Sequence, residues 1–378
     1  MNTPSRILSL TALAAATPFA ASASETLDAL ESNIEKVWKY AKLYENEDNS
    51  IIQKVAFTGR LQYDYAYYDN EETSHIEENE WRRARAGFKV DFLNEFQAHA
   101  EMDMDFNDHD PVYNRLTDAY IAWKPNSDLK IKVGKQSAGF TLDGATSSKK
   151  LYRAERSLIG SNIWFGTEYF VGATVAGKHD NWNWKGGLFS NTRRQEFDNT
   201  FDGSWFTLAS VGYNFADALE VDNATLRLDY VHQDEASNSE SQYTHSRDNL
   251  ENIVSLSFKY DDGKKHLHTD LAYADELDGN DIFALQIMPF YDLTERFQVV
   301  GSYTYIENDD GGLRVSRYAR RAGTAGNDPV DEIHEFYFGL NTYLYGHKVK
   351  WQNGIEYATT NDDEYEGLGF TSAIRLSW

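Results

Sequence analysis

Hydrophobic and polar residues alternate with a period of two in one segment after another of this chain, from Val55 to the last residue. Residues 96–106 show the pattern, with Phe96, Ala98, Ala100, Met102, Met104 and Phe106 on one face and Gln97, His99, Glu101, Asp103 and Asp105 on the other. Successive side chains of a β-strand point to opposite faces. One face of each predicted strand is therefore apolar, and the other carries charges that require water.

Sixteen such segments can be read, and the links between them alternate in length. The predicted strands lie at about 55–68, 81–93, 96–106, 116–125, 129–136, 168–179, 182–189, 205–214, 225–232, 252–260, 266–274, 282–292, 297–307, 335–344, 348–358 and 369–378. Tight turns such as 180–181 alternate with long polar links such as 137–167. This alternation is typical of membrane barrels, which turn tightly on one side of the membrane and carry long loops on the other.

The sequence therefore predicts an all-β fold, a 16-stranded antiparallel transmembrane β-barrel with a short N-terminal helical segment. The mean hydropathy of −0.62 agrees with this fold, because only alternate strand residues face lipid while lumen and loops face water. The final strand ends on Trp378, as expected for a strand that closes such a ring. A large soluble β-protein is the alternative.

The N-terminal residues indicate export followed by a helix. Arg6, the apolar run 7–16 and the small residues 21–23 predict a signal peptide over residues 1–23. Residues 24–50 carry a heptad seam made of Leu27, Leu30, Ile34, Val37, Ala41 and Tyr44. We expect a periplasmic coiled coil that helps a trimer to associate; a single helix on the barrel and a disordered leader are the alternatives. The barrel would occupy residues 51–378, in the lipid and lipopolysaccharide of a bacterial outer membrane.

Composition and motifs narrow the functional classes. The chain has no cysteine, which excludes disulfides and thiolate metal sites. A formal net charge of −24 argues against nucleic acid as a partner. Zinc-protease, P-loop and nucleophile-elbow motifs are absent from the sequence. We therefore predict neither an enzyme nor a cofactor or metal site.

The longest link, about 137–167, is the candidate for a loop that folds inward and narrows the pore. From Lys135 to Gly166 the local charge is +3, from Lys135, Lys149, Lys150, Arg153 and Arg156 against Asp143 and Glu155. Charges beyond a Debye length of about 8 Å are strongly screened, so local charges should govern a constriction. A solvated loop that happens to contain basic residues is the alternative.

Alternation also places Arg60, Arg83 and Arg85 on the lumen side of the first two strands. Clustered guanidinium groups suit an oxyanion, because each planar group can donate to two oxygens. The alternative is that these arginines pair with carboxylates and brace the wall. The predicted lumen is mixed in charge, since lysines such as Lys130 and Lys132 are offset by acids such as Asp118. The four arginines at 314–321 would form a basic funnel at the mouth or lie beside the acids of their own loop.

Several of these motifs resemble the phosphate-selective porin O and P family. The similar stretches are Gly59-Arg-Leu-Gln-Tyr-Asp-Tyr65, Trp81-Arg-Arg-Ala84, Leu129-Lys-Ile-Lys-Val-Gly134, Phe140-Thr-Leu-Asp-Gly-Ala-Thr-Ser-Ser-Lys149 with Glu155-Arg156, and His334-Glu-Phe-Tyr-Phe-Gly-Leu-Asn341 with the strand 348–357. The resemblance is most specific around 129–156 and weaker between 180 and 330.

The resemblance implies a homotrimer of 16-stranded pores whose third loop carries a basic anion site. The basic residues that match the family's anion path by position are Arg60, Arg82, Arg83, Lys149 and Arg156. Alternation puts Arg82 on the opposite face from Arg83, so Arg82 would need the rim or a bulge. The motif typical of strongly phosphate-selective members has a lysine where this chain has Gly144. This departure puts tight phosphate binding in doubt.

The sequence thus predicts an outer-membrane porin that passes inorganic anions passively, with phosphate or polyphosphate as the candidate solutes. A general or cation-preferring porin of the same fold is the first alternative. A secreted β-protein that binds polysaccharide is the second.

Overall fold

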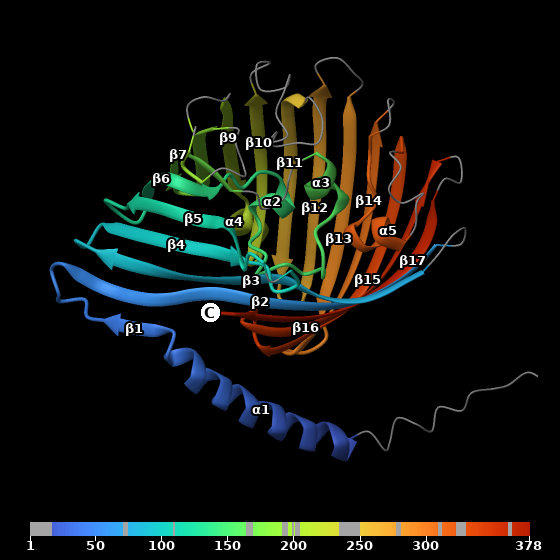
Figure 1. Ribbon diagram of the computed structural model, residues 1–378, viewed down its shortest axis with the longest axis horizontal. Helices are drawn as coiled ribbons and strands as arrows, with labels where there is room; N and C mark the ends of the chain where they lie inside the picture. Colours follow the sequence, from blue (N-terminus) through green and yellow to red (C-terminus); the bar gives the residue numbers. More distant parts are fainter. Residues whose placement is uncertain are drawn as a thin grey trace, which may run out of the picture.

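The computed structural model describes residues 17–70, 75–108, 110–163, 169–190, 196–198, 200, 205–233, 250–276, 281–308, 312–322, 330–361 and 365–378. The first sixteen residues of the predicted signal peptide and residues 164–167 of the predicted loop lie outside this part of the chain. Sixteen antiparallel strands form a closed barrel, because the last strand pairs with the first one of the ring, as in the pair Ile374–Tyr63 (Figure 1). The predicted fold class is confirmed.

The barrel strands follow one another around the ring in chain order. They are β2 (Ile52–Asn70), β3 (His75–Phe92), β4 (Phe96–Met104), β5 (Tyr113–Trp123), β6 (Leu129–Ser137), β7 (Tyr169–His179), β8 (Trp182–Ser190), β9 (Trp205–Asn214), β10 (Asn223–Gln233), β11 (Leu250–Asp262), β12 (Lys265–Glu276), β13 (Ile282–Asp292), β14 (Phe297–Asn308), β15 (Glu332–Tyr345), β16 (Val349–Thr360) and β17 (Glu366–Ser377). The link expected at 69–80 is much shorter in the structure, because β2 and β3 continue to Asn70 and from His75.

The two strand faces divide as the alternation predicts. Phe88 and Val133 point outward and are 53% and 60% exposed, as expected for side chains that meet lipid. On the inner face, Arg85 is 2% exposed and Glu101 is 1% exposed, because the barrel encloses them. An apolar outer face is favourable in lipid, while the lumen can hold charges in water or in ion pairs. The tight turns occupy one end of this wall, which we take as the periplasmic end.

A β-bulge in β3 brings Arg82 to the inner face. Gln62 of β2 pairs with Arg83, but the next residue, Tyr63, pairs with Trp81, so Arg82 is the extra residue. An extra residue interrupts the alternation of a strand. Trp81 therefore stays on the outer face against Tyr63, whereas Arg82 and Arg83 both turn inward.

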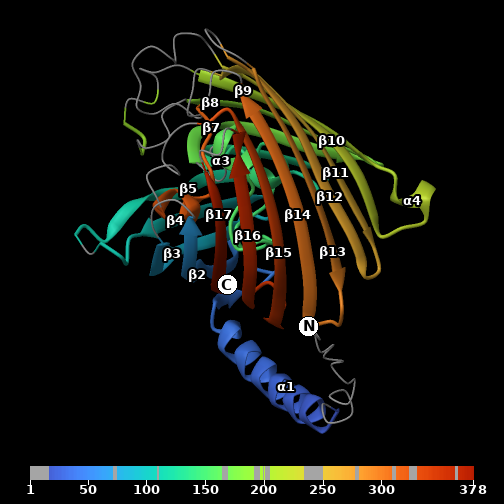
Figure 2. The same cartoon turned by 90° about the vertical axis from the view of Figure 1, so that its right-hand side faces the viewer.

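The N-terminal segment forms a helix outside the barrel. The described residues form the helices α1 (Thr17–Lys39), α2 (Leu142–Ala145), α3 (Leu158–Asn162), α4 (Ala216–Leu219) and α5 (Arg317–Ala322), and a short strand β1 (Lys42–Glu45) pairs with the start of β2. Helix α1 lies below the barrel at the end where β17 finishes (Figure 2). None of the helices in the described part of the chain is both long and apolar enough to cross a bilayer.

Few contacts tie α1 to the periplasmic end of the barrel. The Trp38 indole donates to the Ser377 carbonyl over 2.6 Å, and Arg296, in the β13–β14 turn, pairs with Glu31 over 2.7 Å. Leu30 and Val37 of the heptad seam remain 42% and 61% exposed. The helix therefore presents part of its apolar seam to solvent.

The main apolar cluster lies inside the barrel. Two loop segments fold into the lumen, residues 138–163 between β6 and β7 with α2 and α3, and residues 312–322 between β14 and β15 with α5 (Figure 1). Their buried side chains, such as Leu158, Ile159 and Leu313, pack with apolar residues on the inner face of the wall. We call these segments the constriction loop and the upper loop.

Candidate pore constriction

Basic and amide side chains of the wall hold the constriction loop across the lumen through its backbone carbonyls. Lys185 donates to Ala138 O and Gly139 O over 2.6 and 2.8 Å, and Arg375 donates to Ala154 O over 3.0 Å. Further donors to loop carbonyls are Arg227, Gln62, Asn341, Gln352 and Lys350. These residues come from β2, β8, β10, β15, β16 and β17, so the loop is tied to opposite sides of the barrel.

Arg153 is the most strongly held side chain of the loop. Its guanidinium lies 2.6 Å from Glu335 on β15 and 3.5 Å from Glu356 on β16, and it covers the Tyr337 ring at 4.6 Å from the centroid. Burial disfavours the charged guanidinium, but the two carboxylates outweigh burial and raise the pKa of Arg153. The Arg153 side chain is therefore packed against the barrel wall and holds the loop there.

Three of the predicted wall arginines are each paired with one carboxylate. Arg60 binds Glu101 over 2.8 Å, Arg85 binds Asp103 over 3.1 Å, and Arg82 makes a forked pair with Glu155 of the loop over 2.5 and 2.9 Å. Burial would raise the pKa of Glu155, but the Arg82 guanidinium outweighs burial and lowers that pKa well below its usual range. The alternative in which the wall arginines pair with carboxylates therefore applies to most of these arginines.

Three other predicted cations have no Asp or Glu side chain within ion-pair distance in the part of the chain that the structure describes. Arg83 donates to the Gln62 amide oxygen over 2.8 Å, and Arg156 donates to the loop carbonyls of Asp143 and Thr146. Lys149 donates to the Trp378 carbonyl oxygen over 2.9 Å. Because amide and internal carbonyl oxygens carry only partial charge, Arg83 and Arg156 keep an uncompensated positive charge.

Burial lowers the pKa of two of the loop cations. For Lys149, burial and the nearby Arg60 charge lower the pKa to about 8. For Arg156, burial lowers the pKa to about 10, although Asp143 acts in the opposite direction. At neutral pH both groups are therefore charged, and Lys149 is the group closest to losing its proton.

The structure does not bring all the predicted residues together. Lys150 is exposed at the turn of the loop, beside Lys149. Lys135 shares the outer strand face of Val133 and pairs with Glu196 over 3.0 Å, away from the arginines. Of the arginines expected at a mouth funnel, Arg317 and Arg321 bind the β3 carboxylates Glu80 and Glu78.

A row of lysines lies on the inner face of the wall, where the sequence predicts Lys130 and Lys132 only as part of a lumen of mixed charge. The row comprises Lys89 on β3, Lys124 just after β5, and Lys130 and Lys132 on β6. None has an ion pair within the described residues, and Lys132 covers the Tyr120 ring at 4.8 Å. The sequence signal is the Lys-Ile-Lys-Val alternation of β6, which places both of its lysines inward.

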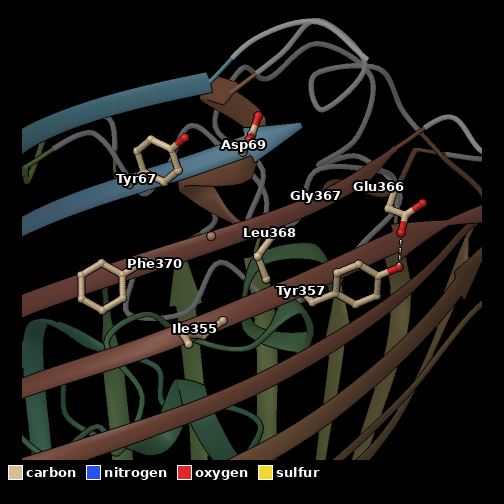
Figure 3. Close-up of a pocket in the computed structure, with 9 residues that line it drawn as sticks. Tyr67, Asp69, Ile355, Tyr357, Glu366, Gly367, Leu368 and Phe370 are labelled. Atoms are coloured by element: carbon tan, nitrogen blue, oxygen red, sulfur yellow. Dashed lines mark hydrogen bonds between the residues drawn. The ribbon is translucent and has the colours of Figure 1, made fainter. Parts of the chain in front are cut away.

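One groove lies on the outer face of the barrel, away from the lumen. This groove of about 360 Å³ runs along the outer face between β2, β17 and β16, and its lining includes Tyr67, Leu368 and Phe370 (Figure 3). At its edge the Tyr357 hydroxyl donates to Glu366 over 2.6 Å. Among the described residues no group of three His, Asp or Glu side chains is arranged to hold a metal ion.

Solved porins have the same fold as this chain. The loop L8 deletion mutant of OmpT from Vibrio cholerae matches with a TM-score of 0.58 at 15% identity, over 86% of this chain and 99% of that one. An anion-selective porin from Comamonas acidovorans matches with a TM-score of 0.59 at 12% identity, over 86% and 99%. The channel DcaP of Acinetobacter baumannii matches with a TM-score of 0.54 at 12% identity, over 89% and 99%. No curated protein sequence matches the chain.

The family model for phosphate-selective porin O and P matches residues 55–261, which include the constriction loop and the arginines of β2 and β3. The barrel and this match indicate a channel of the bacterial outer membrane rather than an enzyme, and they are at odds with a secreted soluble β-protein. The chain belongs to the phosphate-selective porin O and P family.

Proposed function

We propose that this porin passes inorganic anions by passive diffusion, with phosphate and its oligomers as the preferred class. The observation that carries the proposal is the set of cations at the constriction that have no Asp or Glu partner within the described residues, Arg83, Arg156 and Lys149. These positive charges lie at the constriction, whereas most of the chain's excess of acidic residues lies in other parts of the chain. Local charges dominate where the Debye length is about 8 Å.

The mechanism is partial replacement of the anion's hydration shell. Guanidinium groups donate two parallel hydrogen bonds to an oxyanion, and an ammonium acts as a point charge. Passage also requires release, so binding must stay weak. Glu101 and Glu155 each pair with one arginine, and Asp103 lies between Arg85 and Arg115 at 3.1 and 3.9 Å, so these acids limit the net charge of the site. The lysines of β3 and β6 then offer further positive charge along the wall.

Gly144 supports relaxed rather than strict phosphate selectivity. The motif typical of strongly phosphate-selective members of the family has a lysine at this position. This chain therefore lacks one ammonium group of that motif. We therefore expect phosphate to compete with chloride without blocking it at low concentration.

We also propose a homotrimer, in which α1 contributes a periplasmic coiled coil. One similar structure is described as the trimer form of OmpT from Vibrio cholerae, with a TM-score of 0.53 at 14% identity. The exposed Leu30 and Val37 of α1 support association through the heptad seam.

A general or cation-preferring porin is the second candidate, favoured by the net charge of −24 and by the carboxylates paired to the arginines.

The reversal potential across a KCl gradient in a planar bilayer separates the two candidates. A value on the anion side supports the proposal, and a value on the cation side contradicts it. Chloride conductance with added phosphate then tests the solute class, and the R83Q variant should be less sensitive to phosphate than the natural protein.

A further inference from the structure

The upper loop lies directly on the constriction loop inside the barrel. The Asn162 side chain of α3 donates to the Arg314 carbonyl over 3.0 Å and accepts from the Arg314 amide over 2.8 Å. Leu313, Val315 and Tyr318 belong to the same buried apolar cluster as Leu158 and Ile159. The two loops therefore form one packed unit within the lumen.

The upper loop also covers a set of carboxylates on the inner wall. Arg317 makes a forked pair with Glu80 over 2.8 and 2.8 Å, and Arg321 binds Glu80 over 3.0 Å and also binds Glu78. The Tyr318 hydroxyl oxygen lies 2.9 Å from a carboxylate oxygen of Glu80 and 2.9 Å from one of Asp64, so its single proton is shared between the two acids. Burial and the Asp64 charge raise the pKa of Tyr318, so this hydroxyl keeps the proton that it donates.

These carboxylates lie on the approach to the arginines of the constriction. Strand β3 runs from the end with the long links toward the tight turn at 93–95, so Glu78 and Glu80 lie before Arg82 and Arg83 on the extracellular side. Glu80 is separated from Arg82 by one residue of the same strand. An anion that enters from outside reaches the level of these acids before it reaches the arginines.

We propose that Arg317 and Arg321 are selectivity-determining residues that act by neutralising Glu80 and Glu78, without binding the ion themselves. This inference rests on the proposed anion preference of the channel. Without the two guanidinium groups, two uncompensated carboxylates would face the entrance of the arginine site. Their potential would repel anions and attract cations over about a Debye length.

A purely structural role makes a different prediction. If α5 only holds the constriction loop in place, loss of the arginines widens the pore for anions and cations alike. Restoring the charge balance by removing the carboxylates would then not restore selectivity. The two roles can therefore be separated by charge rescue.

The test is the ratio of chloride to potassium permeability from reversal potentials in planar bilayers, at 0.1 M and at 1 M KCl. We expect the R317Q/R321Q variant to lower this ratio at least about threefold at 0.1 M and less at 1 M, because salt screens the exposed acids. The R317Q/R321Q/E78Q/E80Q variant should regain the ratio of the natural protein. The R314Q variant is the matched control, because Arg314 is exposed on the same loop and only its backbone contacts Asn162.

The outcomes separate the two proposals. A cation-side reversal potential for the natural protein contradicts the anion channel itself. An anion-side value that R317Q/R321Q leaves unchanged overturns the present inference alone, as does a loss that the fourfold variant fails to rescue. Should R317Q/R321Q not fold, the E78Q/E80Q variant is measured instead. An unchanged or lower ratio in that variant overturns the inference, because removing only the acids should increase anion preference.

Discussion

At the scale of single residues, the constriction is defined by which cations are left without a carboxylate. Among the residues that the structure describes, Arg83 and Arg156 have only carbonyl or amide acceptors and Lys149 has no Asp or Glu partner, whereas Arg60 and Arg85 each have an acid. An arginine in an ion pair contributes little to the electrostatic potential at a distance, because the adjacent carboxylate cancels its charge. Residues of the same type on neighbouring positions can therefore differ in function.

We expect Lys149 to make the proposed anion preference depend on pH. Because burial lowers its pKa to about 8, the ammonium charge is complete well below pH 8 and is lost as pH rises through that value. We expect the permeability ratio for chloride over potassium to fall between pH 7 and pH 9. Reversal potentials across this range measure the effect.

The K149Q variant is the control for this titration. It should start from a lower ratio at pH 6 and show a smaller change up to pH 9. The K150Q variant alters an exposed neighbour and should keep the pH dependence. A K149Q variant with an unchanged titration would assign the pH effect to other groups.

At the scale of elements, the constriction loop is held mainly by Arg153 and by wall donors to its backbone. Tyr337 supports this arrangement, because its ring lies against two glycines, Gly339 and Gly354, on β15 and β16. A Cβ atom at Gly354 would lie 2.3 Å from the Tyr337 hydroxyl oxygen, so only glycine leaves the ring flat under the Arg153 guanidinium.

Loss of Arg153 should loosen the constriction loop. The R153Q substitution leaves Glu335 and Glu356 buried without their guanidinium, and breaking a buried ion pair costs roughly 3–5 kcal/mol. We expect larger and noisier single-channel currents with weaker anion preference. The K150Q variant is the matched control on the same loop, and quiet currents of natural size in R153Q would exclude this role.

The G354A substitution should act through the same contact. The added methyl group would push the Tyr337 ring from the wall toward Arg153, and overpacking of this kind costs typically about 1–3 kcal/mol. We expect a lower unfolding temperature of the barrel in detergent, measured by heat-dependent mobility in electrophoresis. Alanine at Gly301 is the control, because the nearest atom there is 3.9 Å away. Equal unfolding temperatures for G354A and G301A would contradict the argument.

At the scale of the whole molecule, the periplasmic helix and the barrel are joined by only a few contacts. The Trp38 indole and the Glu31 carboxylate bind the barrel end, while Leu30 and Val37 stay exposed. An exposed apolar seam on a tethered helix is suited to helices of neighbouring subunits.

The seam should therefore contribute to the proposed trimer. The L30D/V37D variant places charges in the seam, and we expect its trimer to dissociate at a lower temperature while the barrel of each subunit stays folded. Size-exclusion chromatography in detergent after graded heating measures this. The S32D variant, with its charge on the same helix outside the seam, is the control. Identical dissociation temperatures in the two variants would favour the single-helix alternative.

The sequence by itself determined the wall of this protein. The sixteen strands and their two faces followed from a period of two, because alternation depends only on neighbouring residues of one strand. The inward candidate loop followed from the length and local charge of the longest link. The tertiary structure decided which cations remain available. Arg153 meets Glu335 and Arg317 meets Glu80 only when distant segments fold into one lumen, and the bulge that turns Arg82 inward appears only in the pairing of β2 with β3. Ion pairing depends on distances in space, which no local pattern encodes.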